Sequence, residues 1–146
     1  MRIQDIILQL LLKQPFYGYV AAMVTPCERD DIAEILLDAA AAPKLLYNRV
    51  WFEALGEQQA MGAVMHELLH LMLMHPFRRG SREKLLWAAA CDMAVNEHIP
   101  SSMLPDTAIT AAKIAMELHE RIPPRESAEA YYGFLLHNDG NISFLE

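Results

Sequence analysis

The stretch His66-Glu67-Leu68-Leu69-His70 carries two imidazoles four residues apart and a carboxylate beside the first. In an α-helix a four-residue step turns about 400°, so the two histidines lie on one face, one turn apart. Both rings can then reach one metal ion. Glu67 lies about 100° round the helix from His66, where its carboxylate can touch a water on that metal without being a ligand. This is the pattern of a zinc hydrolase whose glutamate is the general base.

The residues around this motif are largely apolar, which predicts that its helix is buried on most sides. A shuffled chain with the same six histidines and twelve glutamates would contain about 0.02 copies of the motif, so chance explains it poorly. Buried histidines and a buried glutamate need polar partners, and a metal with its surroundings would supply them. The apolar neighbours are Met65, Leu68, Leu69, Leu71, Met72, Leu73 and Met74.

The whole chain has the composition of one folded domain, residues 1–146, with 53% apolar and 21% charged content. A net charge of −7 argues against nucleic acid or an anionic membrane as the main partner. The first residues are apolar, but Asp5 and Gln9 interrupt them, so we expect a core helix there and not a signal peptide. Cys27 and Cys91 have no CxxC partner, so the expected location is cytoplasmic, with free thiols.

Apolar periodicity and helix breakers divide the chain into helices and one ambiguous segment. In that segment, residues 33–48, the alanines favour a helix, whereas Ile35-Leu36-Leu37 and Leu45-Leu46-Tyr47 suit short strands. Proline after His75 and after Ile99 is expected to end the two strongest helices. The expected helices lie within 1–24, at about 57–75 (the motif helix), at about 84–98 and within 109–137.

A catalytic zinc site usually takes three protein ligands and leaves the fourth position for water, so the motif needs one more. Asp92 is a carboxylate among apolar neighbours on the helix predicted at 84–98. Burial there without a partner would be costly, and a metal would remove that cost. Asn96, one turn further on the same face, can hydrogen-bond Asp92 or a ligand histidine. We therefore expect Asp92 to join His66 and His70 as a metal ligand.

Two other residues remain open as the third ligand. Glu97 lies about 140° round the helix from Asp92, near the helix end, where a carboxylate is ordinarily solvated. His75 follows His70 by five residues, which also places it about 140° off the motif face. It could reach the metal only if the helix unwinds before Pro76.

Five stretches carry a resemblance to a known family: His66-Glu-Leu-Leu-His70, His75-Pro-Phe-Arg78-Arg79-Gly80, Trp87-Ala-Ala-Ala-Cys-Asp92-Met-Ala-Val-Asn96, Leu45-Leu-Tyr-Asn48 and Glu126-Ser127-Ala-Glu-Ala-Tyr131-Tyr132. They resemble the metallopeptidase domain that often precedes von Willebrand factor A-like domains in bacterial proteins. More widely, the chain is similar to the zincin superfamily, especially its small gluzincin-like peptidases. The resemblance covers about Phe16 to Leu136.

The resemblance implies a predominantly helical α+β fold, with a zincin-like core and a small β-sheet or hairpin beside the HExxH helix. It implies that residues 33–38 pair with 44–48, against the helix propensity of the alanines, and that an edge strand borders the cleft. In gluzincins the following helix supplies a glutamate as third ligand; Asp92 is one methylene shorter and requires a closer helix. A protein with a von Willebrand factor A-like domain is an expected partner.

The expected function is a zinc metallopeptidase acting on a peptide or protein. Zn²⁺ held by His66, His70 and Asp92 would lower the pKa of a bound water toward 7 and polarise the scissile carbonyl. Glu67 would take the water proton and deliver it to the leaving amine. The alternative is a zinc-binding adaptor or regulatory domain without peptidase turnover. Candidate donors to the oxyanion are His75, Arg78, Tyr131 and Tyr132, and their spacing does not choose among them.

Overall fold

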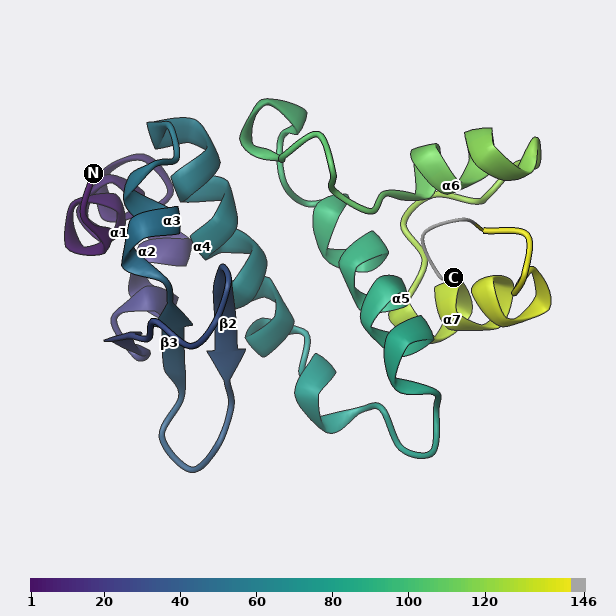
Figure 1. Cartoon of the computed structure of the whole chain (residues 1–146), viewed down its shortest axis with the longest axis horizontal. Coiled ribbons are helices and arrows are strands. Elements are labelled where there is room, and N and C mark those ends of the chain that lie inside the picture. Colours follow the sequence, from purple (N-terminus) through teal and green to yellow (C-terminus); the bar gives the residue numbers. More distant parts are fainter. Residues whose placement is uncertain (143–146) are drawn as a thin grey trace.

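The computed structural model describes residues 1–142, which form a predominantly helical α+β fold, as expected. A small sheet and four helices lie on one side of the molecule, and three helices lie on the other (Figure 1). None of the helices in the described range is long and apolar enough to cross a lipid bilayer. The elements are α1 (Ile3–Lys13), α2 (Pro15–Ala21), β1 (Thr25–Glu28), β2 (Ile35–Asp38), β3 (Lys44–Tyr47), α3 (Arg49–Glu53), α4 (Glu57–Met72), η1 (His75–Phe77), α5 (Lys84–Asn96), η2 (Ser101–Met103), α6 (Ala111–Leu118) and α7 (Ala128–His137).

The sheet has the strand order β1-β3-β2, so β2 has one free edge. β2 runs antiparallel to β3, with Ile35 opposite Tyr47 and Asp38 opposite Lys44, which confirms the hairpin that the resemblance implied. The alanines that favoured a helix lie in the connection between these two strands. β1 pairs in parallel with β3 and was not predicted, because it has only four residues and includes Pro26.

The first hydrophobic core surrounds α4. Met61, Val64, Met65 and Leu68 of this helix are at most 2% exposed and pack with side chains of α1, the sheet and α3. Burial of side chains of this size stabilises a fold by roughly 1.5–3 kcal/mol each. The motif helix is therefore held rigidly from several sides, as its apolar neighbours predicted.

The second hydrophobic core lies among α5, α6 and α7. Trp87 and Met93 of α5 pack there with Leu135 of α7. The end of α5 also contributes to the first core through Val95, and Ile99 follows it there. Because α5 takes part in both cores, it fixes the second half of the fold against α4.

Two helix ends differ from the prediction. α4 stops at Met72 instead of residue 75, because Met74 adopts the left-handed conformation (φ 59°, ψ 24°) and begins η1. This turn directs His75 back toward the motif helix. α5 ends at Asn96, two residues before the predicted end. Within 109–137 the structure has two separate helices, α6 and α7.

Candidate metal centre

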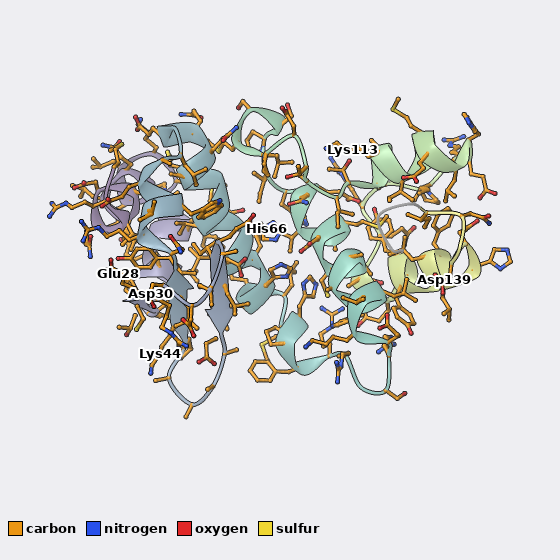
Figure 2. All side chains as sticks on the ribbon, viewed as in Figure 1. Glu28, Asp30, Lys44, His66, Lys113 and Asp139 are labelled. Carbon is orange, nitrogen blue, oxygen red and sulfur yellow. The ribbon has the colours of Figure 1, made fainter. Side chains whose placement is uncertain are left out.

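Three side chains from two helices meet between α4 and α5, where Figure 2 shows His66 near the centre of the molecule. Nε2 of His66 lies 3.0 Å from Nε2 of His70. Each of these nitrogens lies 3.1 Å from Oδ1 of Asp92. Among residues 1–142, these are the three side chains whose donor atoms are grouped closely enough to hold one metal ion. The structure thus brings together the three residues that the sequence predicted as ligands, while their role as ligands stays a prediction.

The three ligand atoms are positioned by the one-turn spacing of the histidines on α4 and by the place where α5 begins. His66 and His70 lie one turn apart on α4. At the start of α5, the Glu83 carboxylate caps the helix by accepting a hydrogen bond from the Leu86 amide at 2.8 Å. Asp92 follows about two turns into this helix and reaches both imidazoles. α5 therefore lies close enough to α4 for an aspartate, although gluzincins use the longer glutamate.

Asn96 fixes the orientation of the His66 ring. Its Nδ2 donates to the Ile109 carbonyl at 2.8 Å, so its Oδ1 is the atom that faces Nδ1 of His66, also at 2.8 Å. An oxygen accepts, so Nδ1 of His66 carries the proton and Nε2 is left with a lone pair. The predicted supporting role of Asn96 agrees with this geometry. The Ile109 carbonyl had no sequence signal, because every residue has one.

His75 contacts His70 from the side away from the triangle formed by Nε2 of His66, Nε2 of His70 and Oδ1 of Asp92. Its Nδ1 lies 3.0 Å from Nδ1 of His70, and its ring meets Trp87 edge-on at a centroid distance of 6.1 Å. Burial, with the charges of His70 and Arg78, lowers the pKa of His75 to about 4. A neutral His75 can accept the Nδ1 proton of His70, which leaves Nε2 of His70 free to bind a cation. His75 is therefore not part of the triangle, although α4 does unwind before it.

The donor set suits zinc. Tetrahedral zinc binds imidazole nitrogen and carboxylate oxygen at about 2.0–2.2 Å, which separates two ligand atoms by about 3.3–3.5 Å. The edges of the triangle, 3.0–3.1 Å, are close to this value. With both ligand histidines protonated on Nδ1, the triangle holds three lone pairs and no proton, an arrangement that a cation stabilises. Three ligands also leave a fourth position open, as catalytic zinc sites do.

The pKa values of the two carboxyl groups in the site, Asp92 and Glu67, are shifted in opposite directions. Burial raises the pKa of Asp92, but in the metal-free site, where a proton on Nε2 of His66 or His70 takes the place of a cation, the hydrogen bonds to these histidines outweigh burial and hold the pKa at about 2. Burial lowers the pKa of His66, and the Asp92 carboxylate more than reverses this, so the net pKa is raised. Burial raises the pKa of Glu67. One carboxyl group is therefore kept ionised while the other holds a proton more readily, which is the division expected between a ligand and a base.

Two further residues of the α5 segment, Glu97 and Cys91, are not members of the metal-binding group. Glu97 accepts hydrogen bonds from the Tyr131 hydroxyl and, at 2.7 Å, from the Arg125 amide. Glu97 therefore anchors the start of the α7 region and does not reach the triangle, while its side chain stays partly exposed to solvent, as expected near a helix end. Cys91 is buried in the second core, and burial raises its pKa to about 12, so it stays a thiol.

Glu67 faces the sheet as well as the triangle. Its Oε2 accepts a hydrogen bond from the backbone amide of Leu37 in β2 at 3.0 Å. This contact joins the motif helix to a strand thirty residues earlier. Side-chain patterns could not predict it, since the donor is a backbone group.

The triangle opens into a cleft of about 520 Å³ between the sheet side and the segment after η2. The walls are mostly apolar, and no lysine or arginine of residues 1–142 lines them. The ionisable side chains in its lining are those of Glu34, His66, Glu67, His70, His75, Cys91 and Asp92. Apolar walls come from Leu36 and Leu37 of β2, Trp51 and Leu55 near α3, and Leu104 and Ile109 after η2.

Each of the four predicted oxyanion donors has a hydrogen-bond partner, but only Arg78 and Tyr131 act as donors in these contacts. His75 is bonded to His70, and the Tyr131 hydroxyl donates to Glu97. The Arg78 guanidinium pairs with both oxygens of Glu129, one of them at 2.9 Å. The Tyr132 hydroxyl accepts a hydrogen bond from the Glu83 amide at 2.9 Å. Arg78, Tyr131 and Tyr132 therefore support the second half of the fold in this structure.

A profile of the protein family described as "Putative metallopeptidase domain" matches residues 1–141. The chain belongs to this family. Membership confirms the resemblance to a metallopeptidase-domain family, whose description implies a metal, while the similarity to zincins stays a prediction. The von Willebrand factor A-like partner is not covered by this match and stays a prediction.

An uncharacterized protein of Thermotoga maritima is 27% identical over 143 aligned residues, which cover 85% of this chain and 34% of that protein. The chain thus spans about a third of the length of this relative. No solved structure matches the chain significantly. The geometry of the site in this family member is therefore described from its own residues alone.

Proposed function

We propose that this domain is a zinc-dependent peptidase in which His66, His70 and Asp92 hold the metal and Glu67 is the general base. The observation that carries the proposal is the triangle of three ligand atoms with edges of 3.0–3.1 Å at the base of a cleft. Glu67 lies beside this triangle, and a purely structural zinc site has no need of an adjacent base. Membership in a metallopeptidase-domain family supports the same reading.

The residues have separate tasks in the proposed reaction. A zinc ion at the triangle would act as a Lewis acid, acidifying a water molecule and polarising the peptide carbonyl. Glu67 takes a proton from the water at its carboxylate and passes it to the amine that leaves. Asn96 and His75 hold the two imidazoles so that each presents Nε2. The apolar walls of the cleft exclude bulk water and leave few competing polar contacts.

The cleft favours an extended peptide as substrate. Its apolar lining and the absence of lysine or arginine there suit apolar side chains and give no partner for an anionic ligand. The free edge of β2 runs along the cleft, and an edge strand offers backbone groups to an added strand. We therefore expect cleavage of unfolded or extended protein segments rather than of small anionic metabolites.

Metal analysis of three matched proteins tests the proposal. Wild type and Glu67→Gln should each retain one zinc per chain after dialysis, whereas Asp92→Ala should lose it. Wild type should cleave members of a broad peptide library, and Glu67→Gln should be slower by about 10²- to 10⁴-fold. Full zinc retention by Asp92→Ala would show that the ligand set is wrong.

An adaptor without turnover is the second candidate, and the structural contacts of two predicted oxyanion donors favour it. The Arg78 guanidinium and the Tyr131 hydroxyl both donate to glutamates that hold the fold together, so these two groups are not free to stabilise an oxyanion. Under this reading, wild type binds zinc but cleaves nothing in the library. Glu67→Gln would then bind zinc and protein partners as wild type does.

A further inference from the structure

At the free edge of β2, only every second residue points its backbone amide and carbonyl toward the cleft. The Glu34 carbonyl accepts a hydrogen bond from the Asn48 amide at 2.7 Å, so these two residues form a hydrogen-bonded pair of the β2–β3 ladder. Such pairs alternate in an antiparallel ladder. Leu36 lies opposite Leu46, two residues further along each strand, so this pair is hydrogen-bonded too. Ile35 and Leu37 lie between these pairs, and their amides and carbonyls therefore point to the free edge of β2.

The Leu37 amide is therefore outside the sheet ladder, and its partner is Glu67. Its N–H donates to Oε2 of Glu67 at 3.0 Å. The described residues provide no other hydrogen bond to the Glu67 carboxylate. One carboxylate oxygen is thus held by the strand, while the second is left for a proton transfer.

We propose that the Leu37 amide is a positioning group for Glu67: it fixes the carboxylate through Oε2 so that Oε1 can act as the base. This inference rests on the proposed peptidase function for its catalytic consequence. Strand β2 then has two roles, because the Leu37 amide orients the base while the Ile35 amide and the carbonyls of both residues remain for a peptide. A substrate strand cannot use the Leu37 amide without releasing Glu67.

Proline substitution isolates this hydrogen bond. Leu37→Pro removes an N–H that the ladder does not use, and proline is tolerated at outward-facing positions of edge strands. Ile35→Pro is the matched control. Ile35 lies on the same strand, and its amide also points away from the ladder. Its side chain, like that of Leu37, is partly buried against the first core. The two variants differ in the contact that is lost: Leu37→Pro releases Glu67 and should act on kcat, whereas Ile35→Pro removes an amide left for a peptide and should act on KM.

Amide hydrogen exchange, followed by NMR on the metal-free chain, tests the bond without any assay of activity. We expect slow exchange at Leu37 in wild type and in Glu67→Gln, since the glutamine oxygen can still accept. In Glu67→Ala, exchange at Leu37 should quicken at least tenfold while exchange at Ile35 stays as in wild type. Equal exchange at Leu37 in wild type and Glu67→Ala would overturn the proposal.

Steady-state kinetics test the consequence. With zinc bound, Leu37→Pro should lower kcat about 10- to 100-fold relative to Ile35→Pro, as expected for a displaced base, with equal zinc affinity in the two variants. Equal kcat values for the Leu37→Pro and Ile35→Pro variants would overturn the positioning role of the Leu37 amide. If wild type shows no turnover, the proposed peptidase function fails, whereas the exchange experiment still decides whether Leu37 holds Glu67.

Discussion

Oδ1 of Asn96 lies 2.8 Å from Nδ1 of His66, while Nδ2 of the same amide donates to the Ile109 carbonyl at 2.8 Å. One side chain therefore joins a predicted metal ligand to the segment that walls the cleft. Because this contact keeps the proton on Nδ1 of His66, Asn96→Ala should weaken zinc binding about 10- to 100-fold. Competition with a chromogenic chelator measures the dissociation constant.

The Asn96→Asp variant is the control for this prediction. Its carboxylate still accepts from His66 but cannot donate to Ile109, so its zinc affinity should stay closer to that of wild type than the affinity of Asn96→Ala does. Wild-type affinity in Asn96→Ala would mean that the amide does not orient the ring. Unfolding of all three proteins in EDTA separates lost affinity from lost stability.

His75 should support zinc binding through the other ligand histidine. Its Nδ1 lies 3.0 Å from Nδ1 of His70, so His75→Phe keeps an aromatic ring beside Trp87 but removes the acceptor. We expect zinc affinity to fall about 10- to 100-fold, measured by isothermal titration calorimetry. His75→Gln, which can still accept, should fall less. The prediction fails if the phenylalanine and glutamine variants bind zinc equally well.

The site could be predicted from the sequence to the extent that side chains carry it. His66 and His70 have a fixed spacing on one helix, and Asp92 is a carboxylate in an apolar helix that needs a partner. Asn96 follows from Asp92 by one helical turn. These inferences needed only helix geometry and the cost of burying a charge, and the structure places all four residues together.

The rest of the site depends on contacts that a single sequence does not encode locally. The Leu37 amide and the Ile109 carbonyl are backbone groups, placed by the sheet register and by the turn after η2. His75 reaches His70 because Met74 takes a left-handed conformation, which is uncommon for a side chain of that size. Tertiary contacts override the helix propensity of the alanines before Pro43, as strand propensity often depends on context.

The pair formed by Arg78 and Glu129 should make stability depend on pH. Hydrogen bonds from Arg78 lower the pKa of the Glu129 carboxyl below its ordinary value of 4.5. A lowered pKa in the folded state stabilises the fold above the ordinary pKa, and this contribution is lost as the pH falls through the lowered value. With both side chains about one-third exposed, the pair should contribute no more than ~1 kcal/mol.

Urea unfolding of wild type and Glu129→Gln, both in EDTA, measures that contribution. The difference in unfolding free energy between the two proteins should be present at pH 7 and disappear once the pH lies well below the ordinary pKa of a glutamate. An undiminished difference at low pH would show that packing of the side chain, and not its charge, is responsible.

Gly62 should be required for the close approach of η2 to the motif helix. A Cβ at this position would lie 2.0 Å from the Met103 carbonyl oxygen, a backbone atom that cannot rotate away. Gly62→Ala should therefore lower the free energy of unfolding by about 1–3 kcal/mol, measured with urea and far-UV circular dichroism. Gly133 lies within α7 with no atom near its would-be Cβ, so Gly133→Ala should instead raise this free energy by about 0.5–1 kcal/mol. If both substitutions stabilise the protein, η2 can move off α4 without cost, and the wall of the cleft after Met103 is not held by this contact.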